Sequence, residues 1–161
     1  MAYRPAQFRR GALLVSLLVL LSSCASTFPR ALMEQVDPTV SFAQLLRTPD
    51  AYQGRLVLVG GELLRTIRGY GAMELEILQR PLSATALPRF FQPSQGRFLV
   101  RVPAHLQRPL PEVGGLLTVI GEVWGAKERG GEVLPYLEAR DLKAWPSWAA
   151  LPPPQFSGVG D

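Results

Sequence analysis

The stretch RLVLVGGELLRTI, residues 55–67, is decisive for the fold. It is rich in Val, Leu and Ile, which is typical of a β-strand. Its residues follow the spacing V-x-V-x-G-x-L over 57–63, and a matching L-x-V-x-G-x-V occurs at 117–123. A glycine inside a strand marks a sharp bend or the close approach of another backbone. Gly60, Gly61 and Gly121 therefore predict two long, bent strands, as a small coiled barrel requires.

Outward from this stretch, the chain reads as four more strands. They are expected at 72–80, 96–102, 116–128 and 132–145, the last of them broken by Pro135. In the second strand, Met73, Leu75 and Ile77 alternate with polar residues, so 55–67 and 72–80 predict an antiparallel hairpin around the turn RGYG at 68–71. The pattern predicts a mainly β fold, a small five- to six-stranded antiparallel OB-like barrel. An open β-sandwich is the alternative.

One short N-terminal helix precedes the first strand. Ser41 followed by Gln44 matches a capping box, and the spacing of Phe42 and Leu45 gives the helix one apolar face. Pro49 is expected to end it.

The first 23 residues have the layout of a secretory signal, with a basic start and an apolar run of about 11 residues over 11–21. That run is too short for a membrane span, which needs roughly 20 residues. The segment LSSC, residues 21–24, resembles the bacterial lipobox, in which small residues precede an acylated cysteine. Cys24 is the only cysteine of the chain, so we predict that its thiol accepts a diacylglycerol. Cleavage before Cys24 then frees its amine for a further acyl chain such as palmitate. An ordinary signal peptide with an incidental cysteine is the alternative.

These features divide the chain into a cleaved signal (1–23), a lipidated Cys24 with a tether (24–40), a barrel domain (41–145) and a Pro- and Gly-rich disordered tail (146–161). The residues after Cys24 are Ala25 and Ser26 rather than an aspartate, which favours the outer membrane over the inner one. Three of the 17 Lys and Arg lie in the signal, so the mature chain has a net charge of about +1. The high pI therefore does not predict a nucleic-acid partner.

The mature chain resembles the Slp (starvation lipoprotein) family of bacterial outer-membrane lipoproteins. The resemblance rests on the lipobox cysteine and on four segments, SFAQLLRTPDAYQGRLVLVGGELL, LEILQRPLSATALP, SQGRFLV and LLTVIGEVWG. It runs from about Cys24 to Trp145. It implies a small β-barrel domain held at the outer membrane, and it implies no reaction.

The residues offer little for catalysis. Glu74 and Glu76 lie on one face of a strand, roughly 7 Å apart by strand rise, which is a separation that glycosidases use. Two such glutamates ordinarily meet water and cross-strand cations such as Arg65. His105, the only histidine, lies in a Pro-flanked loop and is expected at the surface, and Ser94 has no nucleophile elbow around it. We therefore predict no catalytic residues, no metal site and no cofactor.

The connection 81–95 is the most distinctive candidate for contact with a partner. Arg80, Arg89 and Arg97 bracket it, and it contains Phe90 and Phe91. Arginine binds carboxylates and phosphates through paired hydrogen bonds, and exposed aromatic rings anchor partners. Contact of Arg80, Phe90, Phe91 and Arg97 with an anionic or glycan envelope component is therefore one interpretation. The other is that the arginines pair with Glu74, Glu76 or loop carbonyls while the rings plug one end of the barrel.

The sequence thus predicts a non-enzymatic lipoprotein of the outer membrane with a structural or binding role, on the periplasmic face rather than the cell surface. Its partners would be the membrane, through Cys24, and an envelope protein or glycan, with no nucleic acid. The alternatives are an envelope glycan hydrolase that uses Glu74 or Glu76, and an accessory subunit of an outer-membrane assembly or transport complex.

Overall fold

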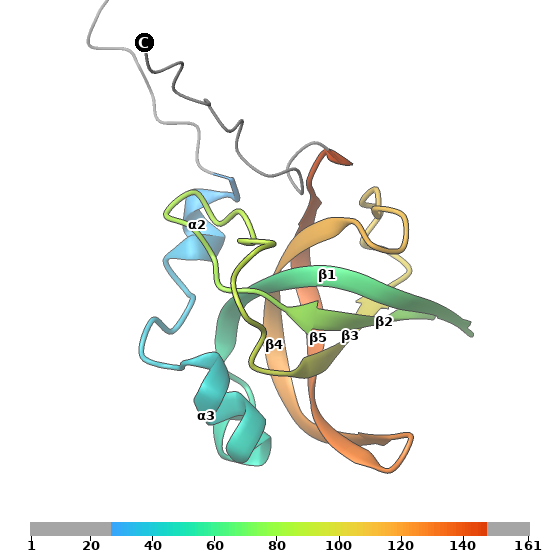
Figure 1. The fold of residues 1–161 in the computed structure, drawn as a ribbon. Coiled ribbons are helices and arrows are strands. Elements are labelled where there is room, and N and C mark those ends of the chain that lie inside the picture. The colour runs from blue at the N-terminus through green and yellow to red at the C-terminus, as the bar shows by residue number, and fades with distance from the viewer. Residues whose placement is uncertain (1–26, 148–161) are drawn as a thin grey trace, which may run out of the picture.

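The computed structural model describes residues 27–147, which form a barrel with short helices packed against it (Figure 1). Its elements are α2 (Arg30–Met33), α3 (Phe42–Arg47), the 3₁₀ helix η1 (Pro49–Tyr52), β1 (Leu56–Gly69), β2 (Ala72–Gln79), β3 (Arg97–Pro103), β4 (Leu116–Arg129) and β5 (Glu132–Ala144). The strands close into a barrel in the order β1-β2-β3-β5-β4. The predicted five-stranded barrel is confirmed. The open sandwich is excluded because the five strand pairings form a complete ring, which the bonds of β1 to both β2 and β4 close.

One pairing differs from the predicted antiparallel arrangement. β3 and β5 run parallel, through Leu99–Arg101 and Tyr136–Glu138, whereas the other four pairings are antiparallel. Strand direction reverses at every antiparallel pairing, so a closed ring of five strands cannot be antiparallel all the way round. One parallel pair is a necessary consequence of the odd strand number.

The glycines of the repeated spacing lie where strands crowd together. Gly61 pairs with Gln79 of β2 and with Leu117 of β4, at the point where β1 passes from one neighbour to the other. A Cβ at Gly61 would lie 1.9 Å from the carbonyl oxygen of Leu78, and one at Gly60 would lie 2.8 Å from that of Leu117. Only glycine fits, as the spacing predicted.

The barrel interior holds the main apolar core, and α3 contributes to it. Leu45 is fully buried in this core, and the ring of Phe42 lies edge-on against Phe98 with 5.6 Å between ring centres. The capping box is present, because the Ser41 hydroxyl accepts from the Gln44 amide while the Gln44 side chain accepts from the Ser41 amide. The predicted helix is therefore confirmed.

A second, smaller core lies outside the barrel. Phe28, Ala86 and Ile120 are buried together in it, so the N-terminal segment and the connection 81–95 both pack against β4. Val36 also pairs with Leu56 at the start of β1. Residues 27–40 are thus packed against the barrel, which differs from the predicted tether, and the apolar contacts of Phe28 account for the difference. Residues 24–26 lie outside the described range, as does the predicted tail beyond residue 147.

Pro135 does not break β5, contrary to prediction. It pairs with Ala126 of β4, and β5 meets β3 only from Tyr136 onward. Proline is tolerated where a strand has a neighbour on one side only, because the missing N–H interrupts no second ladder. Within residues 27–147, no helix has the length and apolar character needed to cross a bilayer.

Candidate functional site

The two glutamates of β2 are held in ion pairs on the outer surface of the barrel. Glu76 is only 2% exposed, and each of its carboxylate oxygens accepts a hydrogen bond at 2.6 Å, one from Arg65 and one from Arg97. Glu74 lies between Lys127 and Arg129 of β4. The interpretation that these carboxylates meet cross-strand cations, Arg65 among them, is confirmed.

These ion pairs occupy the carboxylate oxygens that acid–base chemistry on a sugar would need. A retaining or inverting glycosidase needs two carboxyl groups that face the glycosidic bond from opposite sides. The oxygens of Glu76 are directed to two guanidinium groups instead, and burial keeps them from solvent. The arrangement is typical of a structural ion-pair network.

Beside this network, the rings of Trp124 and Tyr136 form an edge-to-face pair with 5.9 Å between ring centres. The Arg101 guanidinium lies 5.4 Å from the centre of the Trp124 ring, and the Lys127 ammonium lies 4.6 Å from the centre of the Tyr136 ring. Trp124 is 43% exposed although it is a large apolar ring. Tyr136 is half-buried, so the exposed Trp124 ring is the part of this pair that a partner could cover.

A shallow groove of about 300 Å³ adjoins this aromatic pair. It is lined by the end of β1, the start of β2 and facing parts of β3, β4 and β5, and includes Tyr70, Glu74, Arg101, Lys127, Arg129 and Tyr136. Tyr70, at the β1–β2 turn, is fully exposed. We call Trp124 together with these groove residues the aromatic groove.

Sequence reasoning missed the aromatic groove, although one signal for Trp124 was available. The alternation that directs Val119 and Val123 into the core places Trp124 on the outer face of the same strand. Tyr136 and Arg101 gave no such signal, because their contact with Trp124 depends on the register of β3 and β5 with β4.

The predicted contact residues in and beside the connection 81–95 lie in two separate parts of the structure. Arg80, Phe90 and Phe91 lie together: the Arg80 guanidinium donates to the Gln92 carbonyl at 2.9 Å and lies 5.3 Å from the centre of the Phe90 ring, which packs edge-to-face on Phe91. Arg80 also pairs with Glu62 at 3.2 Å. Phe91 is 61% exposed, so its ring is available at the surface.

Arg97 lies instead in the ion-pair network of the barrel face. It pairs with Glu76 and with Glu132 of β5. The hydrogen bond to Glu132 is the main reason that the pKa of Arg97 is raised above its usual range. This arginine therefore stays charged and paired with acids of its own chain.

The remaining candidates offer no catalytic arrangement. His105 is exposed, as predicted, and the Ser94 hydroxyl is bonded to the backbone of Gly96. Among residues 27–147, no group of three or more His, Cys, Asp or Glu could hold a metal ion. Cys24 lies outside the described residues.

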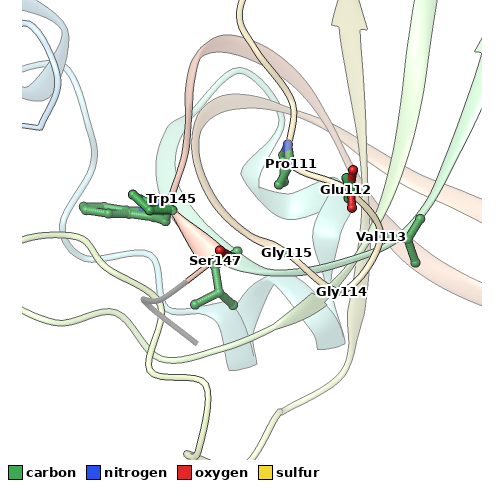
Figure 2. A pocket seen from close by; sticks show the side chains of 9 residues that line it. Pro111, Glu112, Val113, Gly114, Gly115, Trp145 and Ser147 are labelled. Atoms are coloured by element: carbon green, nitrogen blue, oxygen red, sulfur yellow. The ribbon is translucent and has the colours of Figure 1, made fainter. Parts of the chain in front are cut away.

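A second cavity, of about 560 Å³, lies between the 111–115 loop and the end of β5 (Figure 2). The Trp145 ring lies on one side of it, and its indole N–H donates to the Thr118 hydroxyl at 2.9 Å. Glu112 is the only titratable side chain among its nine lining residues, so this cavity provides no pair of groups for proton transfer.

Comparison with solved structures gives seven matching chains, of which two illustrate the similarity. The N-terminal domain of the PriB protein from Thermoanaerobacter tencongensis is 14% identical, with a TM-score of 0.35 over 56% of this chain and 96% of that chain. Schizosaccharomyces pombe Pot1pC bound to single-stranded DNA is 13% identical, with a TM-score of 0.36 over 59% of this chain and 81% of that one. Similarities at this level say nothing about what this chain binds.

Comparison at the sequence level is more informative. No curated protein matches the sequence significantly. A model of the outer membrane lipoprotein Slp family matches residues 21–155, which is most of the chain and agrees with the resemblance carried by its motifs. The chain therefore belongs to the Slp family of outer membrane lipoproteins.

Proposed function

We propose that this outer membrane lipoprotein has a non-catalytic binding role, with Cys24 as its lipid anchor. Membership of the family supports a role in the envelope. The ion pairs of Glu74 and Glu76 support the absence of catalysis, because these glutamates were the only paired carboxylates that the sequence offered for hydrolysis. The chain would act from the periplasmic face by holding a ligand near the membrane.

The aromatic groove carries the binding part of this proposal. OB-type barrels bind oligosaccharides and oligonucleotides over strands 2 and 3 and between the β1–β2 and β4–β5 loops. The groove lies in this region, with Tyr70 at one end and Arg129 at the beginning of the β4–β5 turn. Its cations are already paired with Glu74 and Glu138, which disfavours a polyanion such as nucleic acid. Exposed rings beside polar groups fit an oligosaccharide, and the envelope is rich in them.

A test of the groove compares Trp124→Ala with Val113→Ala. Both residues are exposed and apolar. Val113, however, lies in the loop before the start of β4, whereas the groove includes Lys127 and Arg129 at the end of β4. With soluble glycan strands from the cell wall as the ligand, calorimetry should show a loss of about tenfold or more in affinity for Trp124→Ala, as for an aromatic hot spot. Val113→Ala should bind like the wild type. Equal affinity of all three proteins would overturn the groove as a glycan site.

A test of the anchor compares Cys24→Ser with Ser26→Ala. The serine variant cannot accept a thioether-linked lipid, and it should move from the membrane fraction to the soluble periplasmic fraction. The Ser26→Ala variant should stay with the outer membrane. Membrane sedimentation of a cleaved Cys24→Ser protein would contradict the anchor.

The hydrolase alternative and the accessory-subunit alternative make different predictions. If Glu76 served a hydrolase, Glu76→Gln would abolish release of sugar from cell-wall glycan. If the chain were an accessory subunit, it would co-purify with a larger outer-membrane complex after crosslinking. Binding without product release and without such a complex would favour the non-catalytic binding role.

A further inference from the structure

The length of chain between the anchor and the barrel is very short. Thr27 is the first described residue, and it follows Cys24 by three positions. Three residues of fully extended chain span at most about 11 Å. The Cα atom of a lipidated Cys24 therefore lies within that distance of the Cα atom of Thr27.

Thr27 is itself held against the barrel. Its hydroxyl donates to the carbonyl of Thr85 at 2.8 Å, and the next residue, Phe28, is 3% exposed in the second core. Further along, the Asp37 amide donates to the Leu56 carbonyl at 2.8 Å. The segment 27–40 cannot lengthen into a tether without losing these contacts.

The turn 83–87 of the connection 81–95 lies at the same place, through the contacts of Thr85 with Thr27 and of Ala86 with Phe28. This turn is closed by hydrogen bonds between Ser83 and Leu87, and Ala84 and Thr85 are exposed at the tip. The same connection carries the exposed Phe91 ring and the exposed Arg89. The Phe side chains of a surface-bound protein are buried at the boundary between headgroups and acyl chains, and arginine extends its charge to the headgroups while its stem lies on apolar surface.

We propose that this face rests on the lipid surface in which Cys24 is anchored. The face consists of residues 27–30 and the connection 81–95, and its partner is the headgroup region of a phospholipid bilayer. Figure 1 shows the described chain beginning on one side of the barrel, while the β1–β2 and β4–β5 turns extend on the other side. The aromatic groove, between those turns, then opens away from the membrane.

This orientation rests on the proposed anchor at Cys24, and a quenching experiment separates the two. The chain has no other cysteine, so Ala84→Cys and Tyr70→Cys each give one free thiol once Cys24 is acylated. Both positions are exposed and lie at turns, which makes Tyr70 the matched control for Ala84. Each purified acylated protein is labelled with a small fluorophore and reconstituted into phosphatidylethanolamine–phosphatidylglycerol vesicles that contain a brominated lipid.

The label at position 84 should be quenched at least threefold more than the label at position 70. A second variant inserts a 12-residue Gly-Ser linker between Ser26 and Thr27, which lets the barrel move away by about 20 Å. The insertion should lower quenching at position 84 to the level at position 70 and leave sedimentation with vesicles unchanged.

Equal quenching at the two positions, with the protein bound to vesicles, would overturn the orientation and leave the anchor intact. Failure of the acylated protein to bind vesicles would overturn the anchor itself. Quenching at position 84 that persists after the linker insertion would contradict the short connection as the feature that holds this face on the lipid.

Discussion

Replacing Gly61 by alanine tests whether close backbone contact fixes the barrel. The added Cβ would lie 1.9 Å from the carbonyl oxygen of Leu78 and 2.8 Å from its carbonyl carbon. Both are backbone atoms of Leu78 in the neighbouring strand β2, so no rotation of a side chain relieves the clash. β1 and β2 must therefore separate by about 1.5 Å before the contact with the carbonyl oxygen becomes an ordinary one.

The cost follows from what this separation disrupts. Overpacking a well-packed interior costs about 1–3 kcal/mol, and each ladder hydrogen bond lost beside Gly61 costs about 1 kcal/mol. With two such bonds, Gly61→Ala should lower the free energy of unfolding by about 3–5 kcal/mol. That is a large part of the about 5–15 kcal/mol that stabilises an ordinary domain.

Gly69→Ala is the matched control on the same strand. Its Cβ would meet the nearest atom at 3.4 Å, an ordinary contact, and its φ is not in the left-handed region. Both substitutions restrict the unfolded chain equally, so the difference between them isolates the clash. Urea unfolding of the mature protein in mild detergent, followed by tryptophan fluorescence, measures that difference. Unfolding free energies within about 0.5 kcal/mol of each other would refute the reasoning.

Three further predictions concern stability. Glu76→Gln should lower the free energy of unfolding by about 2 kcal/mol. This is less than the loss expected for a fully buried ion pair, because the two arginines that bind Glu76 are partly exposed. An unchanged urea midpoint would contradict this prediction. Ser41→Ala should cost about 1 kcal/mol by removing the helix cap, with Ser41→Thr as the control that keeps the hydroxyl. The Thr39 hydroxyl holds the pKa of Asp37 below its usual range, so the stability that Asp37 contributes is complete above the ordinary aspartate pKa and is lost as pH falls through the lowered folded value. Unfolding curves from pH 7 to pH 2 should therefore show the wild type and Asp37→Asn converging in acid, and a widening gap would speak against this.

The local parts of the fold could be predicted from the sequence. The helix 42–47 follows from one capping box. The barrel follows from the repeated spacing of glycines, which predicted a close approach of neighbouring backbones. These features depend on residues that are neighbours along the chain. That one pair of neighbouring strands runs parallel could also have been deduced, since an odd number of strands in a closed ring requires it, but which pair it is depends on the strand order.

What the sequence could not give depends on contacts between distant residues. The burial of Phe28 against Ile120 joins segments about ninety positions apart in the chain, and no local periodicity marks the segment that carries it. The pairing of Trp124 with Tyr136 likewise needs the register between β4 and β5. The candidate arginines could be located, but not their acid partners, so Arg97 was grouped with Arg80 although it belongs to the network around Glu76.

The closed ring has a consequence for a protein concentrated in the plane of a membrane. Within residues 27–147, every barrel strand has a neighbour on each side over part of its length, so only the ends of the long hairpins leave short edges open to edge-to-edge growth between crowded copies. The narrowest seam is the one between β3 and β5, which spans three residue pairs. Amide hydrogen exchange should be faster along that seam than along the other ladders of the barrel, because separating β3 from β5 breaks the fewest hydrogen bonds.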